Sequence, residues 1–115
     1  MESILTTIKK LLGIAEEDDS FDTDVILHIN STFMILNQLG VGPSEGFMIE
    51  DESATWADFV PDGISIEAVK SYIYLRVKLF FDSNTTPSAV IEAMNRTIAE
   101  LEWRLNVAVE STQSN

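Results

Sequence analysis

One segment of this 115-residue chain restricts the possible folds more than any other: the run AVKSYIYLRVKLFF, which starts at Ala68. Its apolar spacing predicts a helix over about residues 66–81, with Ser65 as the N-cap. Two apolar stripes cover more than half of the circumference of this helix, whereas a surface helix needs only one. We therefore expect the helix to be central in the fold or shared with another subunit. The stripes are formed by Val69, Ile73, Val77 and Phe80, and by Tyr72, Leu75 and Leu79.

Two helical patterns precede this segment. A short amphipathic helix is expected over about residues 3–12 and ends at Gly13. The next helix is expected to have Asp22 as its N-cap, with Phe21 packed against Ile26 as a hydrophobic staple. It ends at a pair of glycines. The apolar stripes of the two helices are Ile4, Ile8, Leu11 and Leu12, and Ile29, Phe33 and Leu36.

A fourth helical pattern occupies the C-terminal part of the chain. Thr86 is its expected N-cap and Pro87 its first helical residue. Apolar residues then alternate at spacings of three and four, which predicts a heptad-like seam. The polar segment 110–115 is expected to be a flexible tail. The seam consists of Ile91, Met94, Ile98, Leu101, Leu105 and Ala108.

The segment between the second and third helices has no helical pattern. It contains most of the glycines and two of the three prolines, so a long irregular loop is expected over 42–63, with room for a short β-hairpin. Loops of this length are often functional, and Trp56 and Phe59 either pin the loop to the helices or belong to an interface. The predicted fold is all-α: a small bundle of about four helices in one domain spanning residues 1–115.

The charge balance limits the possible partners. Nineteen acidic and seven basic residues give a formal charge of −12, which opposes binding to nucleic acid or anionic lipid. The acidity either keeps a small apolar protein soluble or forms a surface that lies near nucleic acid without binding it, or imitates it. No apolar run is long enough for a membrane span and no signal peptide is visible, so a cytosolic protein is expected.

Candidates for chemistry are few. His28 is the only histidine and lies within a predicted helix, so a surface or structural role is expected for it. The acidic series from Asp18 to Asp24 resembles a calcium loop, but Thr23 and Ile29 stand where Gly and Glu are needed. There is no cysteine and no grouping of nucleophile, base and orienting residue. We expect no enzymatic activity, no cofactor and no metal.

The apolar helix surface exceeds what one small core needs, which indicates self-association or a protein partner. The residues of several short segments, and their order along the chain, are informative. The run IKKLLGI, the segment SFDTDVILHINSTFMILNQLGVG, the loop around Trp56, the run SYIYLRVKLFFD and the helix after Pro87 follow one another in order. Over residues 1–109 the chain resembles the small head-tail connector proteins of tailed bacteriophages, also called adaptor or head-completion proteins.

The resemblance implies an adaptor in the neck of a virion. Such connectors are helical proteins that form a homo-oligomeric ring, typically a dodecamer, below the portal of the DNA-filled head. The ring extends the DNA channel toward the tail. The implied partners are the portal protein and a downstream neck or tail-completion protein, while DNA passes through without specific binding. The protein would be made in the host cytoplasm and end at the head-tail junction, with no membrane contact.

Only coarse residue roles follow from this resemblance. A ring needs two different apolar patches on each subunit, which the third helix and the seam of the fourth could supply. The tail at 110–115 would reach the portal, and the loop at 42–63 would face the channel or the next ring. The acidic candidates for the channel wall are Glu50, Asp51 and Glu52. The candidates for contacts between subunits are Tyr72, Leu75, Leu79, Trp56, Phe59, Leu101 and Leu105.

A second function stays open at this level: an acidic DNA mimic, or another small helical inhibitor or adaptor that binds a protein partner. A DNA mimic should array carboxylates along helix faces at regular spacing. Here the carboxylates cluster in the connections. The third helix is also basic at Lys70, Arg76 and Lys78, which counts against mimicry.

Overall fold

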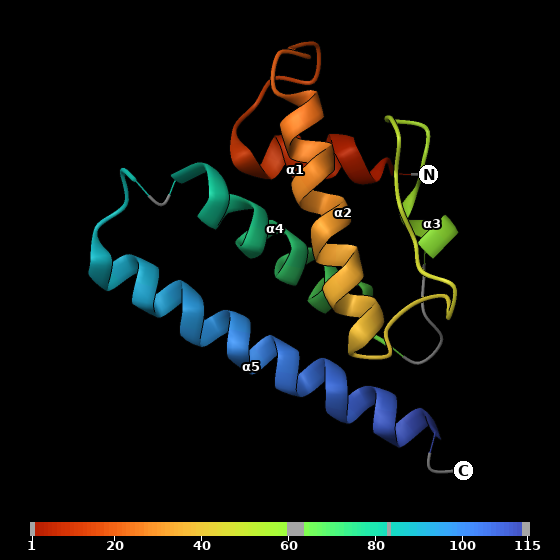
Figure 1. Cartoon of the computed structure of the whole chain (residues 1–115). Coiled ribbons are helices and arrows are strands. Elements are labelled where there is room, and N and C mark those ends of the chain that lie inside the picture. The colour runs from red at the N-terminus through yellow and green to blue at the C-terminus, as the bar shows by residue number, and fades with distance from the viewer. Residues whose placement is uncertain (1, 60–63, 83, 114–115) are drawn as a thin grey trace.

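The computed structural model describes residues 2–59, 64–82 and 84–113 (Figure 1). These residues form helices and contain no strand, so the predicted all-α class is confirmed. Within the described part of the loop at 42–63, no β-hairpin is present. A short helix and an isolated antiparallel bridge between Ser3 and Thr55 occur there instead. The helices are α1 (Ile4–Leu12), α2 (Asp22–Gln38), α3 (Trp56–Phe59), α4 (Ile66–Asp82) and α5 (Ser88–Gln113).

Helix α4 is at the centre of the molecule. It contacts α1, α2 and α5, and in Figure 1 it lies between α1 and α2 above and α5 below. Neighbours on several sides explain why one apolar stripe is not enough for this helix. The central position predicted for this segment is therefore confirmed. Its fully covered side chains are Val69, Tyr72, Ile73 and Val77.

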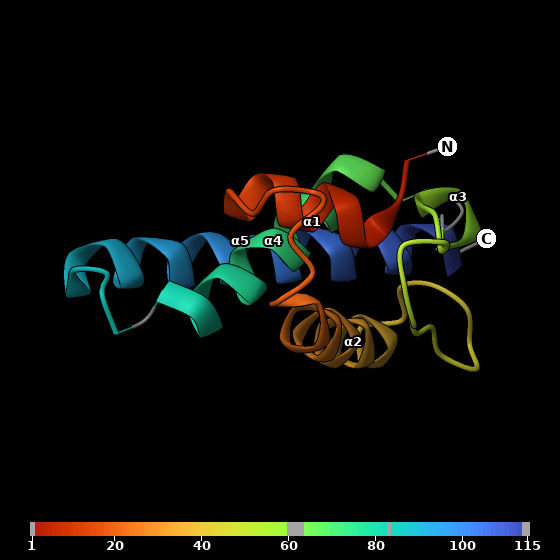
Figure 2. The same cartoon turned by 90° about the horizontal axis from the view of Figure 1, so that it is seen from above.

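Helix α5 is the longest element and the least enclosed. Its 26 residues span about 39 Å at 1.5 Å per residue, so it extends beyond the 17-residue α4. Ile98 and Leu105 of the predicted seam are buried, and its four other members are half-buried. At the far end, Val109 approaches Gly40 so closely that a Cβ on the glycine would lie 3.0 Å from Val109 Cγ1. In Figure 2, α5 runs behind α4 at a level between α1 and α2, and in Figure 1 no other helix lies below it.

The ends of α1 agree with the sequence pattern, but its buried face differs. Ser3 Oγ accepts a hydrogen bond from the Thr6 amide at 3.2 Å, and Gly13 ends the helix at φ 82°. The predicted stripe included Leu11, which is 48% exposed, and left out Leu5, which is buried. By sequence spacing, Leu5 and Leu11 fit a helical stripe with Ile8 equally well. Only the packing of α1 on α4 decides which of the two is buried.

The predicted start of α2 is wrong. Asp22 is the first helical residue, Phe21 holds the N-cap position, and no side chain caps the helix. The Asp22 carboxylate instead pairs with Lys9 of α1 at 2.8 Å. Phe21 is 44% exposed and turns its ring edge-on to Phe81 at the end of α4, with 6.4 Å between the centroids. Asp22 and Phe21 thus have partners that are distant in the sequence, Lys9 and Phe81, instead of the predicted cap and staple contacts.

Helix α5 also differs at both ends from its predicted bounds. Pro87 precedes the helix, and its carbonyl oxygen accepts hydrogen bonds from the amides of Val90 and Ile91 at 3.0 and 3.1 Å. The helix continues to Gln113, so residues 110–113 of the predicted flexible tail are helical. Ser114 and Asn115 lie outside the described residues. At α4, by contrast, the Ser65 hydroxyl accepts from the Ala68 amide at 3.3 Å, as the predicted cap requires.

Candidate functional site

The acidic and histidine side chains of the described residues do not gather into a candidate metal site. Among them, no three His, Asp or Glu side chains come together in a way that could hold a metal ion. His28 stacks on Phe80, with ring centroids 4.1 Å apart and planes 8° apart, and Phe81 lies edge-on to it at 5.6 Å. Such contacts give the histidine a packing role. The candidate site is therefore a set of surfaces.

None of the helices in the described part of the chain has the length and apolar character that crossing a membrane requires.

The residues predicted to contact a neighbouring subunit lie mostly inside this chain. Four of them are at most 4% exposed, and the other three are half-buried against the same core. A side chain that is already covered within its own chain has little surface to offer to a neighbouring subunit. The four covered residues are Trp56, Phe59, Tyr72 and Leu105, and the half-buried ones are Leu75, Leu79 and Leu101.

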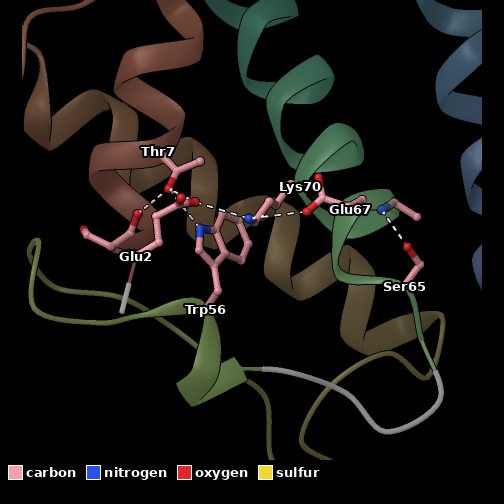
Figure 3. Close-up of polar contacts among 8 residues, drawn as sticks. Glu2, Thr7, Trp56, Ser65, Glu67 and Lys70 are labelled. Carbon is pink, nitrogen blue, oxygen red and sulfur yellow. Dashed lines mark hydrogen bonds and ion pairs between the residues drawn. The ribbon is translucent and has the colours of Figure 1, made fainter.

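A polar cluster holds the end of the long loop (Figure 3). The Trp56 indole N–H donates to Thr7 Oγ1 at 3.0 Å, across 49 residues of sequence. The Thr7 hydroxyl lies 2.6 Å from the Ser3 carbonyl oxygen and 2.9 Å from Glu2 Oε1. The backbone joins as well, because the Trp56 amide donates to the Glu2 carbonyl at 3.1 Å. We call Glu2, Thr7, Trp56 and Lys70 the Trp56 cluster.

Lys70 connects the Trp56 cluster to α4. Its Nζ lies 3.2 Å from Glu2 Oε1, 3.6 Å from Glu67 Oε1 and 5.5 Å from the centre of the Trp56 ring. Hydrogen bonds from Thr7 and then from Lys70 lower the pKa of the Glu2 carboxyl. The carboxylate is thus kept ionised beside the ammonium group. Through these contacts, the N-terminal segment, the loop and α4 hold one another in place.

The acidic tip of the loop, formed by Glu50, Asp51 and Glu52, is exposed. The hydroxyl and the amide of Ser53 both donate to Asp51 Oδ1 and hold the pKa of Asp51 below its usual value of 3.8. The loop just before the tip is anchored to α2, since Asn30 exchanges two hydrogen bonds with the backbone of Ile49, at 2.8 and 3.0 Å. The tip is therefore an exposed, negatively charged segment that follows a part of the loop anchored to α2.

A groove opens between α2 and the loop. It has a volume of about 490 Å³. Phe33 and Phe47 lie at its base with ring centroids 5.0 Å apart. Met34 and Met48 line it and are 64% and 69% exposed. We call this feature the methionine groove. Glu45 stands at its polar rim together with Asn37 and Gln38.

The outer face of α5 carries a second apolar surface. Trp103 is 66% exposed and Val107, one turn later, is 39% exposed. On a helix, residues three, four and seven apart share a face, so Arg96 and Glu100 lie along the same line. We call Arg96, Glu100, Trp103 and Val107 the α5 stripe. The methionine groove and the α5 stripe escaped the sequence-based selection, although Trp103 stands outside the predicted seam and could have been recognised from that.

A polar contact sets the rotation of α5 on α4. The Tyr72 hydroxyl donates to Glu102 Oε2 at 2.6 Å, and Arg76 Nη1 lies 3.3 Å from the same oxygen. Burial, followed by the hydrogen bond to Glu102, raises the pKa of Tyr72, which keeps the phenol protonated and donating. Trp103, the next residue along the helix, is 66% exposed.

Comparison with known proteins gives one match. The family model described as "Phage connector protein" matches residues 4–112, nearly the whole chain. No curated protein and no solved structure gives a significant match.

Proposed function

Because the chain belongs to the phage connector protein family, a structural component of bacteriophages, we propose that it is a head-tail connector that forms a ring below the portal. In this role it extends the DNA channel and joins the head to the tail. The observation that carries the proposal is the family match over residues 4–112. The surfaces of the chain add physical support.

Two separate apolar surfaces support the ring. A closed ring of identical subunits needs a head-to-tail interface, in which two different patches of one chain meet. The methionine groove and the α5 stripe are two such patches and lie on different elements. A subunit with one patch of each kind can bind a neighbour on either side. The typical twelvefold symmetry follows from the resemblance to connectors.

The charge distribution supports a channel through which DNA slides. The formal charge is −12, and five of the seven lysines and arginines already form ion pairs with carboxylates of the same chain. Few cations are thus left for phosphate groups. The acidic tip at 50–52 is exposed and is our candidate for the channel wall. A negative wall repels DNA phosphates and lets the duplex pass without binding.

The proposed partners are the portal protein on the head side and a neck or tail-completion protein on the tail side. The C-terminal end of α5 is our candidate for the portal contact, because the helix runs beyond α4 and continues past the buried Val109 into the exposed Glu110 and Ser111 (Figure 1).

The decisive experiment is electron microscopy of lysates from a phage that carries an early stop codon in this gene. We expect separated heads and tails, with heads that lose DNA, and restoration by the wild-type gene supplied in trans. Intact tailed particles would contradict the connector role and direct attention to the DNA-mimic alternative. Binding of the purified protein to its cognate portal, measured by co-sedimentation, gives the independent biochemical test.

A further inference from the structure

We propose that Trp103 of one subunit inserts into the methionine groove of the next, and that this contact is the repeating interface of the ring. The inference rests on the proposed connector function and names the surfaces that meet. The occupant of the groove is thus a second copy of this chain, and the contact is heterologous.

The α5 stripe needs a partner that the chain itself does not supply. The seam on the opposite side of α5 already packs on the bundle, with Ile98 and Leu105 at 5% and 2% exposure. Trp103 and Val107 are exposed, whereas Glu102 is bound by Tyr72 of α4. An exposed tryptophan centred on a rigid helix is the usual anchor of a protein interface.

The methionine groove suits an aromatic side chain. The rings of Phe33 and Phe47 form its base and the thioethers of Met34 and Met48 its sides, and sulfur makes favourable contacts with aromatic rings. Methionine side chains also adapt to the shape of an incoming group. An indole N–H needs an acceptor on burial, which the side-chain oxygens of Gln38 or Glu45 at the rim can provide.

The charges around the two surfaces favour a second copy as the partner. Two chains with a charge of −12 repel each other unless their few cations lie at the contact. The α5 stripe carries Arg96, for which the structure shows no ion pair, and the neighbouring Arg104 pairs only with the exposed Glu100 at 2.7 Å. The groove presents Glu45 at its rim. Insertion of Trp103 thus brings arginines of one copy to a carboxylate of the next.

The positions of the two surfaces favour a series of head-to-tail contacts, which can close into a ring, over a two-fold dimer. In Figure 1 α5 runs along the lower side of the molecule, whereas the loop that forms one wall of the groove lies at the right, beside α2. A two-fold contact between two α5 stripes would leave both grooves uncovered. A groove-to-stripe contact uses both surfaces and leaves a free one at each end until the ring closes.

The absence of cysteine from the chain gives a direct test. Full-length Val107→Cys and Met48→Cys proteins, which both keep the Trp103 anchor, are purified separately, mixed at high concentration and oxidised. We expect a disulfide-linked dimer in the mixture and none with either variant alone. Val90→Cys mixed with Met48→Cys is the matched control and should not link, because Val90 is 47% exposed on the same helix but lies away from the stripe.

The other outcomes separate this inference from the connector proposal. Linkage of Val107→Cys to itself would show two-fold pairing through α5 and overturn the inference, and so would the absence of a link in every sample. Analytical ultracentrifugation of the wild-type chain, with and without the cognate portal, then decides about the connector role. Rings or portal complexes without this link would leave the connector role in place. A chain that stays monomeric and ignores the portal would remove both.

Discussion

Lys9 of α1 and Asp22 at the start of α2 form an ion pair with 2.8 Å between Nζ and Oδ1. Lys9 is 3% exposed, which is rare for a lysine. Its Nζ also donates a hydrogen bond to the Glu16 carbonyl oxygen at 3.0 Å, while Asp22 Oδ1 makes no hydrogen bond of its own, so the contact with Asp22 is mainly electrostatic. The pair joins the two helices across the acidic connection between them.

Removing the carboxylate should therefore destabilise the fold. We expect Asp22→Asn to lower the free energy of unfolding by about 1–3 kcal/mol, because it leaves a covered ammonium group without its counter-charge. Asp24→Asn is the control, since Asp24 is exposed in the same first turn and affects only the helix dipole, by about 0.3–1 kcal/mol. Urea unfolding measures both. Equal losses in the two variants would contradict a special role for the ion pair.

The Trp56 cluster makes a second prediction about stability. Thr7→Val removes the acceptor of the Trp56 indole N–H, which is covered, so the free energy of unfolding should fall by about 1–3 kcal/mol. Thr97→Val makes the same chemical change on exposed helix surface and should have little effect. In a double-mutant cycle with Trp56→Phe, the two losses should not add. Additive losses would mean that the hydrogen bond contributes nothing.

Alanine substitutions at two glycines distinguish the cost of backbone strain from the cost of steric crowding. Gly42 and Gly46 have φ angles of 94° and 93°, so alanine at either position costs about 1–2 kcal/mol. A Cβ at Gly42 would also lie 2.5 Å from Phe59 Cε1, whereas a Cβ at Gly46 meets nothing within 4 Å. We expect Gly42→Ala to be more destabilising than Gly46→Ala by about 1–3 kcal/mol, as in overpacked cores. Equal thermal unfolding midpoints would show that Phe59 moves aside freely.

Features that depend on neighbouring residues in the chain could be predicted from the sequence. The cap at Ser65, the stop at Gly13 and the seam of α5 all follow from local patterns. The central place of α4 follows from its two stripes, because an apolar circumference must be covered.

Features that depend on distant residues could not be predicted. Asp22 fits a cap by its type, but its partner is Lys9, which lies on another helix. The methionine groove depends on the place of the loop beside α2, where Asn30 exchanges two hydrogen bonds with Ile49 and Met48 and Met34 line the same groove. The candidate interface residues were chosen because they are large, apolar and helically spaced. Residues that fill the core of the subunit itself have the same properties.

Acid titration of the loop tip gives a pH-dependent prediction. Ser53→Ala removes the hydroxyl donor to Asp51 and should raise the pKa of Asp51 toward 3.8, although the amide donor stays. A carboxyl with a lowered pKa in the folded chain stabilises the fold above its unfolded value, and this contribution disappears as the pH falls through the folded pKa. The variant should thus differ from wild type above about pH 4 and converge with it in stronger acid. NMR titration of the Asp51 carboxyl measures the shift. Ser44→Ala is the control, and an unchanged pKa in Ser53→Ala would contradict the prediction.

Trp103 should matter for assembly and hardly at all for folding. Its side chain is 66% exposed, so Trp103→Ala should change the free energy of unfolding by no more than about 0.5 kcal/mol. An anchor of an interface, by contrast, contributes about 2 kcal/mol or more to binding, which is roughly a thirtyfold loss of affinity per contact. A ring repeats the contact at every subunit, so we expect Trp103→Ala to abolish assembly by sedimentation while its unfolding midpoint stays that of wild type. Val90→Ala, a truncation of an exposed apolar residue away from the stripe, should assemble normally. Normal assembly of Trp103→Ala would assign the exposed tryptophan to another partner, such as the portal or the downstream neck protein.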